Sequence, residues 1–211
     1  MKIEIALIQV TPFEENCRVI IDRDSETALV CDPGDSAQQI KAQLDKENLE
    51  LKAILLTHAH LDHIGAVKEL SALTGARIIG PALDDAYLIE HIADQALGLG
   101  LPQCEPFTPE YVEDNQELNL IAGLPLKVIT TPGHTPGGVC YYCESLKFLL
   151  SGDTLFYCSV GRTDFPRGNF EDLRSSIRDK LFSLPDDTAV LCGHGPDTSI
   201  GFEKKSNRFV L

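Results

Sequence analysis

The stretch 57-THAHLDH-63 is the most informative part of this sequence, and it begins at the last residue of the apolar run 52-KAILLT-57. A continuous apolar run is typical of a strand buried on both faces. Three histidines and one aspartate then fall within the six residues 58–63. Burying imidazoles and a carboxylate together is costly unless a cation compensates them. The stretch therefore predicts a metal site at the carboxyl end of a buried strand.

Three further polar residues stand at the ends of later apolar runs, and a glycine precedes each. They are His134 in 131-TPGHTPG-137, Asp153 in 151-SGDTLF-156 and His194 in 193-GHGP-196. Glycine lets the backbone turn sharply and approach another group closely. Because the strand ends of an open α/β sheet deliver side chains to one edge, we expect these residues to meet the 58–63 stretch there.

These side chains are too numerous for one metal ion. A catalytic zinc ion takes three protein ligands and keeps one position open, whereas a pair of ions about 3.5–4 Å apart shares more ligands. Nitrogen and oxygen ligands without thiolate suit zinc, iron or manganese, and zinc is the default expectation. We expect two divalent ions, the first held by His58, His60 and His134 and the second by Asp62, His63 and His194, with Asp153 bridging them.

The composition describes a globular chain with an acidic balance. Of 211 residues, 43% are hydrophobic and 24% charged, and 18 Lys and Arg against 32 Asp and Glu give a net charge of −14. This disfavours nucleic-acid and anionic-membrane partners, which require a positive surface. The seven cysteines are scattered, the N-terminus has no signal-peptide pattern, and no apolar run approaches a membrane span. We expect a reduced, cytoplasmic protein.

Strand and helix patterns alternate in both halves of the chain. Helices are expected from a capping box at Ser36 and Gln39, from about Asp62 to Gly75, over 84–96, and from Asn169. His91 lies inside the third of these and is interpreted as an ordinary polar helix residue. Strands bracketed by helices predict one α/β domain over residues 1–211, with helices outside the sheets. The expected strands are 3–10, 18–22, 28–32, 52–57, 76–80, 117–121, 126–131, 138–143, 147–150 and 188–192.

At these motifs the sequence resembles the metallo-β-lactamase superfamily, and within it the glyoxalase II-like hydrolases. The resemblance implies an αβ/βα four-layer sandwich with a dinuclear site at the sheet edge. Glyoxalase II proper continues into a helical domain that binds glutathione, whereas 17 residues follow His194 here. The chain thus resembles the short, bacterial type of hydroxyacylglutathione hydrolase-like protein. The matching pieces are 57–63, 131–137, 151–156 with 161-GRTDF-165, 193–196 and the early turn 32-DPG-34.

This resemblance implies hydrolysis of a small anionic thioester such as S-lactoylglutathione. A hydroxide held by the two ions would attack the thioester carbonyl, and Asp62 or Asp153 would orient it and take its proton. The leaving thiol has a pKa of about 8.5, so it departs without a dedicated acid. The resemblance therefore assigns catalytic as well as ligating roles to these two aspartates.

Five residues have candidate supporting roles, each beside a simpler alternative. Asp32 either accepts an imidazole N–H and fixes its tautomer, or only forms an Asx-Pro turn. Arg162 and the tail cations Lys204, Lys205 and Arg208 either bind substrate carboxylates or are solvated charges.

Other reactions remain open at the same motifs. The persulfide dioxygenases resemble this chain but use one iron ion, held by the counterparts of His58, His134 and Asp153, a triad suited to iron. Lactonases, phosphodiesterases and a non-catalytic metal-binding protein are further alternatives. The common dizinc lactamases place a cysteine where this chain has Asp153, which disfavours antibiotic hydrolysis. The oligomeric state is left open.

Overall fold

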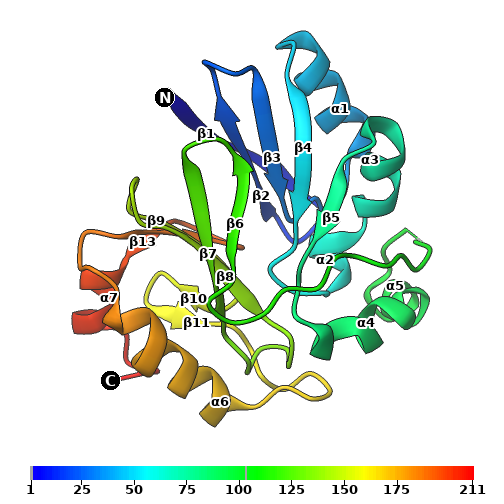
Figure 1. The fold of residues 1–211 in the computed structure, drawn as a ribbon. Helices are drawn as coiled ribbons and strands as arrows, with labels where there is room; N and C mark the ends of the chain where they lie inside the picture. Colours follow the sequence, from blue (N-terminus) through cyan, green and yellow to red (C-terminus); the bar gives the residue numbers. More distant parts are fainter. Residues whose placement is uncertain (1, 103) are drawn as a thin grey trace.

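Two β-sheets pack face to face between outer layers of helices in the computed structural model, which describes residues 2–102 and 104–211 (Figure 1). Helices α1 (Ala37–Lys46) and α3 (Val67–Thr74) cover the outer face of the first sheet. Helices α6 (Phe170–Ser175) and α7 (Ile200–Ser206) cover the outer face of the second. The αβ/βα four-layer sandwich expected from the sequence is confirmed.

The first sheet has five strands in the order β1-β2-β3-β4-β5. The first three pair antiparallel, whereas β3, β4 and β5 run parallel. Parallel neighbours need a crossover connection, and α1 lies in the one from β3 to β4. The strands are β1 Ile3–Val10, β2 Glu15–Asp22, β3 Thr27–Cys31, β4 Glu50–Leu55 and β5 Arg77–Ile79.

The second sheet has six strands in the order β13-β12-β9-β8-β7-β6. Only β12 and β9 pair in parallel among the described strands of this sheet, and their crossover contains α6 and the small hairpin β10-β11. The strands are β6 Glu117–Ile121, β7 Leu124–Thr130, β8 Val139–Cys143, β9 Phe148–Gly152, β10 Leu155–Phe156, β11 Ser159–Val160, β12 Ala189–Cys192 and β13 Thr198–Ser199.

The apolar run at β4 is buried on both faces, as its composition predicts. Ala53 and Leu55 pack between the two sheets, where they join the fully buried Tyr141 of β8. Ile54 and Leu56 point the other way and pack beneath α1 and α3. This alternation follows the two-residue period of a strand. The 58–63 stretch therefore begins at the end of a strand that lies against both the second sheet and the outer helices.

Two helix predictions near the site are wrong in detail. Ser36 precedes α1, but its backbone is left-handed (φ 65°) and its side chain makes no capping hydrogen bond, so the capping box with Gln39 does not form. The helix expected from about Asp62 is interrupted. It forms α2 (Leu61–Ile64) and then α3, because the Ala66 amide donates to the carbonyl of Pro33 (3.0 Å).

The helix expected over 84–96 is also split, and the break falls at His91. The Nδ1–H of His91 donates to the carbonyl of Tyr87 (2.8 Å), so His91 closes one helix and opens the next. The start at Asn169 is confirmed, since its side chain accepts from two amides of α6. The remaining helical segments are η1 Leu83–Asp85, α4 Ala86–Glu90, α5 Ile92–Leu99, η2 Ser176–Lys180 and η3 Leu181–Ser183.

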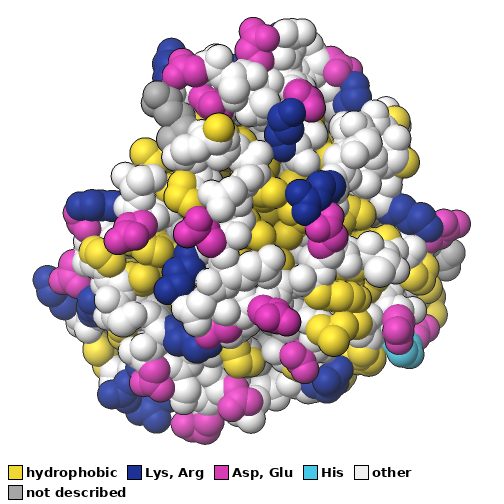
Figure 2. All heavy atoms as spheres, viewed as in Figure 1, with side chains coloured by type: hydrophobic (Ala, Val, Ile, Leu, Met, Phe, Trp, Pro, Cys, Tyr) yellow, Lys and Arg dark blue, Asp and Glu magenta, His cyan; other side chains and the backbone are white. Residues whose placement is uncertain are grey.

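The surface agrees with a mixed, acidic composition. On the face drawn in Figure 2, acidic and basic side chains are interspersed, and no continuous basic field is visible there. Over the described chain, no helix combines the length and apolarity that crossing a membrane requires.

Candidate metal centre

The candidate ligands follow strand ends of both sheets, and most lie in loops, whereas Asp62 and His63 lie in α2. The 58–63 stretch follows β4, His134 follows β7, Asp153 follows β9 and His194 follows β12. The structure brings these loops together, and their ligand atoms form three groups within 4.8 Å: His58 with His60 and His134, Asp62 with His63 and His194, and Asp32 with His58 and His63. We call the first group the first site and the second group the second site.

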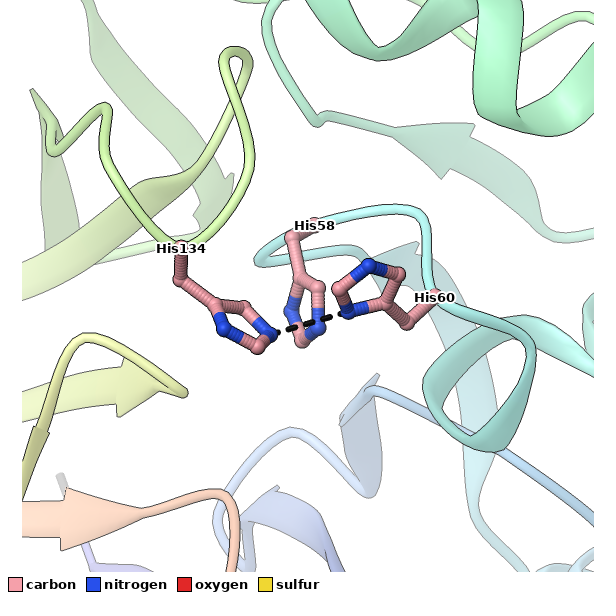
Figure 3. A group of neighbouring side chains, drawn as sticks. All are labelled: His58, His60 and His134. Carbon is pink, nitrogen blue, oxygen red and sulfur yellow. Dashed lines mark hydrogen bonds between the residues drawn. The ribbon is translucent and has the colours of Figure 1, made fainter. Parts of the chain in front are cut away.

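The first site is built from three imidazoles that converge on one point (Figure 3). His60 Nδ1 lies 2.9 Å from His134 Nε2, and His58 is buried beside both rings. His58 Nε2 is itself buried and has no hydrogen-bond partner among the described residues. Three ring nitrogens are therefore available to one ligand.

In two of these rings, Nδ1 faces away from the site and forms a hydrogen bond. The Thr57 hydroxyl donates to Asp32 Oδ2 (2.6 Å) and so accepts from His58 Nδ1–H (3.1 Å). His134 Nδ1–H donates to the carbonyl of Arg162 (2.6 Å). Both rings thus carry their proton on Nδ1 and present the lone pair of Nε2 to the site. Such outer contacts fix tautomer and orientation in metal-binding histidines.

The second site has the same construction with a carboxylate added. His63 Nε2 lies 3.2 Å from His194 Nε2, which in turn lies 3.4 Å from Asp62 Oδ2. His63 Nδ1–H donates to Asp32 Oδ2 (3.2 Å), and His194 Nδ1–H donates to the carbonyl of Phe13 (3.0 Å). Both rings again direct Nε2 toward a common point.

Asp153 lies between the two sites. Its Oδ2 is 3.5 Å from His134 Nε2 of the first site and 3.7 Å from His194 Nε2 of the second. Its Oδ1 is 3.4 Å from His63 Nε2 but, like His58 Nε2, has no hydrogen-bond partner within the described chain. One carboxylate can therefore contact ions in both sites.

Glycine is required at two of the strand ends, as the sequence pattern suggests. Gly152 has φ 48°, and a Cβ there would lie 2.2 Å from Thr57 Oγ1. A Cβ at Gly193 would lie 2.4 Å from Asp153 Oδ1. Side chains at these positions would displace the site.

The pKa shifts differ between the two sites. Burial, followed by the neighbouring imidazoles, holds the pKa of His58 well below its ordinary value and lowers the pKa of His60 to about 3. Burial opposes protonation of His63 as well, but Asp153 and Asp62 raise its pKa well above the ordinary range. The first-site histidines are thus neutral at pH 7, the form that binds metal, while the second site concentrates negative charge.

The residues present fit two metal ions. Around a tetrahedral zinc ion with ligands at about 2.0–2.1 Å, the ligand atoms lie roughly 3.3 Å apart. The nitrogen pairs at 2.9 and 3.2 Å are close to that spacing. Buried polar atoms without partners are rare in proteins, and a cation in each site would satisfy both His58 Nε2 and Asp153 Oδ1.

Asp32 lies behind the histidines rather than among them. Its two oxygens accept from the Thr57 amide (2.8 Å), the Thr57 hydroxyl and His63 Nδ1. It therefore links the backs of His58 and His63, which is the supporting position considered from the sequence.

Two further residues that sequence reasoning missed hold these loops. Buried Asp85 accepts from the amides of Ala59 (3.0 Å) and Gly137 (2.6 Å), and burial raises its pKa to about 6. Gln95 accepts from the Leu61 amide (3.1 Å) and donates to the Ala59 carbonyl (3.1 Å). In the sequence both resemble ordinary polar residues near helices, because their partners lie far along the chain.

A cavity of about 740 Å³ opens above both sites. Its lining contains ligand candidates of both sites together with apolar residues of α4, of α5 and of the 156–166 segment, which includes β11. Among the described residues, Arg162 is the one Lys or Arg in that lining. Its guanidinium pairs with Asp164 (2.7 Å) and lies 4.3 Å from the Phe165 ring centroid.

The structure does not bring the other expected substrate cations to the cavity. Lys204, Lys205 and Arg208 are absent from its lining. Residues 200–206 form α7, which packs behind the second sheet, and Lys204 pairs there with Asp186 (2.6 Å). The helix α7 thus holds the two lysines outside the cavity, and the role of all three residues in substrate binding stays a prediction.

Comparisons with known proteins agree with this geometry. A family model described as the Metallo-beta-lactamase superfamily matches residues 10–194, a range that includes every candidate ligand. The chain is 41% identical over 207 residues to a Haemophilus influenzae protein named Hydroxyacylglutathione hydrolase GloC, covering 98% of this chain and 97% of the relative.

Two solved structures share the fold over nearly the whole chain. The B3 metallo-beta-lactamase BLEG-1 superposes with a TM-score of 0.90 and 35% identity, covering 98% of this chain and 99% of that one. TTHA1623, solved in a di-iron-bound form, superposes with a TM-score of 0.87 and 34% identity, covering 97% of this chain and 99% of that one.

Proposed function

The chain belongs to the metallo-beta-lactamase superfamily, and from this premise we propose that it is a metal-dependent hydrolase of small-molecule thioesters such as S-lactoylglutathione. One observation carries the proposal. The imidazole nitrogens of two sites lie on either side of Asp153, at the floor of a cavity. The name of the Haemophilus influenzae relative supports the thioester class.

Each site would hold one divalent ion, with zinc the first choice and iron or manganese also compatible with the ligands. His58, His60 and His134 would hold one ion, and Asp62, His63 and His194 the other, with Asp153 contacting both. When bound, such a pair of ions supplies hydroxide near neutral pH and polarises a substrate carbonyl.

The chain's own groups would then orient and deprotonate the attacking water. Asp62 and Asp153 both border the cavity, so the carboxylate of either residue is a candidate to orient the water and accept its proton. The leaving thiol, with a pKa of about 8.5, departs as thiolate and needs no acid.

The remaining cavity surface would bind the rest of the thioester. Phe165 and Leu99 supply apolar contact, and Arg162 offers a guanidinium to a substrate carboxylate in exchange for Asp164. Arg–carboxylate pairs form two parallel hydrogen bonds, so this exchange preserves the pairing of the guanidinium.

The test joins metal analysis to turnover. The purified protein is loaded with zinc, manganese or iron, its metal content is measured by plasma mass spectrometry, and thiol release from S-lactoylglutathione is followed with a thiol reagent. We expect two equivalents of metal and thioester hydrolysis that is lost on chelation and regained on metal addition.

Parallel arms separate the alternative reactions. Oxygen uptake with glutathione persulfide at one iron per chain would identify a dioxygenase instead. Ring opening of a lactone or a chromogenic cephalosporin, or cleavage of a phosphodiester, without thioester turnover would identify another hydrolase of the superfamily. Any of these results would overturn the thioester proposal.

A further inference from the structure

Glu15, the first residue of β2, is a buried acid that the proposed chemistry does not use. Its exposed fraction is 0%, and neither carboxylate oxygen has a hydrogen-bond partner among the described residues. His63 of the second site lies beside it, with Glu15 Oε1 3.7 Å from His63 Nδ1. Burying an unpaired carboxylate is costly, so a residue that only packed there would be better apolar.

The backbone holds Glu15 firmly against the second site. Glu15 forms an isolated β-bridge with His194, and the next amide, that of Asn16, donates to the carbonyl of Gly193 (2.8 Å). The Asn16 side chain donates to the carbonyls of Cys192 (3.0 Å) and Gly195 (2.9 Å). The backbone of Glu15 is therefore fixed beside that of His194, and its carboxylate faces His63.

Asp32 already accepts the imidazole N–H that a supporting carboxylate usually accepts behind a metal-binding histidine. It lies closer to His63 Nδ1, at 3.2 Å, and accepts the proton of that ring. Glu15 is therefore not needed to select the tautomer of His63, and its contribution is negative charge and a second contact along the ring.

That charge has little else to balance it in the protein. Among the described residues, only His63 places a basic nitrogen within 4 Å of this carboxylate. Arg18, the nearest cation along β2, pairs with Asp197 instead. A divalent ion beyond His63 would supply the missing positive charge.

We propose that Glu15 is a positioning residue for the second site, where its carboxylate orients His63 and favours a divalent ion at Asp62, His63 and His194. The inference rests on the metal sites of the proposed function but not on its substrate. It predicts that loss of Glu15 weakens binding of the ion at the second site more than binding of the ion at the first site.

The test compares Glu15→Gln, Glu15→Asp and a control. Glu203→Gln is the control, because Glu203 of α7 is equally buried. Unlike Glu15, its carboxylate accepts hydrogen bonds, from Thr198 and Asn207, behind the second sheet. Metal-free protein is titrated with zinc against a chromophoric chelator, and the melting temperature is recorded for the metal-free and zinc-loaded forms.

We expect Glu15→Gln to weaken the second zinc equivalent by about 10–100-fold, the usual effect of losing an outer partner of a ligand. The first equivalent stays unchanged, the metal-free protein melts no lower than wild type, and Glu15→Asp retains most of the affinity. Glu203→Gln lowers both melting temperatures and leaves zinc affinity intact.

Three results would overturn the inference: unchanged affinity for both equivalents in Glu15→Gln, equal weakening of both, or a loss of metal-free stability that matches the loss in the loaded form. Wild-type protein that binds fewer than two zinc ions overturns both this inference and the proposed metal centre. Two tight zinc ions without thioester turnover overturn only the proposed function.

Discussion

The floor and the wall of the cavity are built in opposite ways. On the floor, His134 is 5% exposed, and its ring is held by the carbonyl of Arg162 behind it. On the wall, Phe13 is 44% exposed and Leu99 is 37% exposed, and both side chains are apolar. The floor is thus buried and polar, whereas the wall is more accessible and carries apolar side chains beside Arg162. This division places the chemistry on strand ends and the choice of substrate on surrounding segments, where loops tolerate change.

Replacing the shared carboxylate tests the floor most severely. We expect Asp153→Asn to reduce hydrolysis by well over about 100-fold, more than loss of an outer partner costs, because both sites lose a charged oxygen. Metal content should fall by at least one equivalent per chain. Metal content is measured by native mass spectrometry, and turnover is measured by thiol release. Full turnover with two bound ions would exclude the shared role.

A smaller change to the floor removes one supporting hydroxyl. Thr57→Val keeps the side-chain shape but deletes the group between His58 and Asp32. We expect the affinity of the first metal ion to fall by about 10–100-fold, measured by competition with a chelator. Thr188→Val is the matched control, since the buried Thr188 hydroxyl has no partner in the described structure. Equal affinities in the two variants would contradict the role of Thr57.

A substitution in the wall should change substrate binding without changing metal binding or kcat. Phe165 lies 5.0 Å from the His60 ring and borders the cavity, so Phe165→Ala removes apolar contact without touching a ligand atom. We expect KM for a thioester to rise by at most about tenfold, or about 1.4 kcal/mol, with kcat and metal content unchanged. Phe170→Ala, outside the cavity lining, should leave KM unaltered. A fall in metal content of Phe165→Ala would show that wall and floor are not independent.

The sequence by itself determined the fold class and the set of candidate ligands. Glycines before Asp153 and His194, and the buried strand before His58, are local patterns that can be recognised without knowing the fold. The αβ/βα sandwich that the family resemblance implies is confirmed, and the structure brings the candidate ligands together, although their metal ligation stays a prediction. The helix patterns were less reliable, because the break after α2 depends on a hydrogen bond to Pro33.

Only the tertiary structure decided which groups stand behind those ligands. The carbonyl of Phe13 reaches His194 from the other end of the chain, and Asp85 joins the loops of His60 and His134. Glu15 approaches His63 in the same way, from a strand that the sequence did not connect with the site. Backbone carbonyls and single buried acids carry no distinctive sequence spacing, so their roles arise only when packing of the two sheets brings distant segments together. The same packing turned the expected basic tail into α7 and took its lysines away from the cavity.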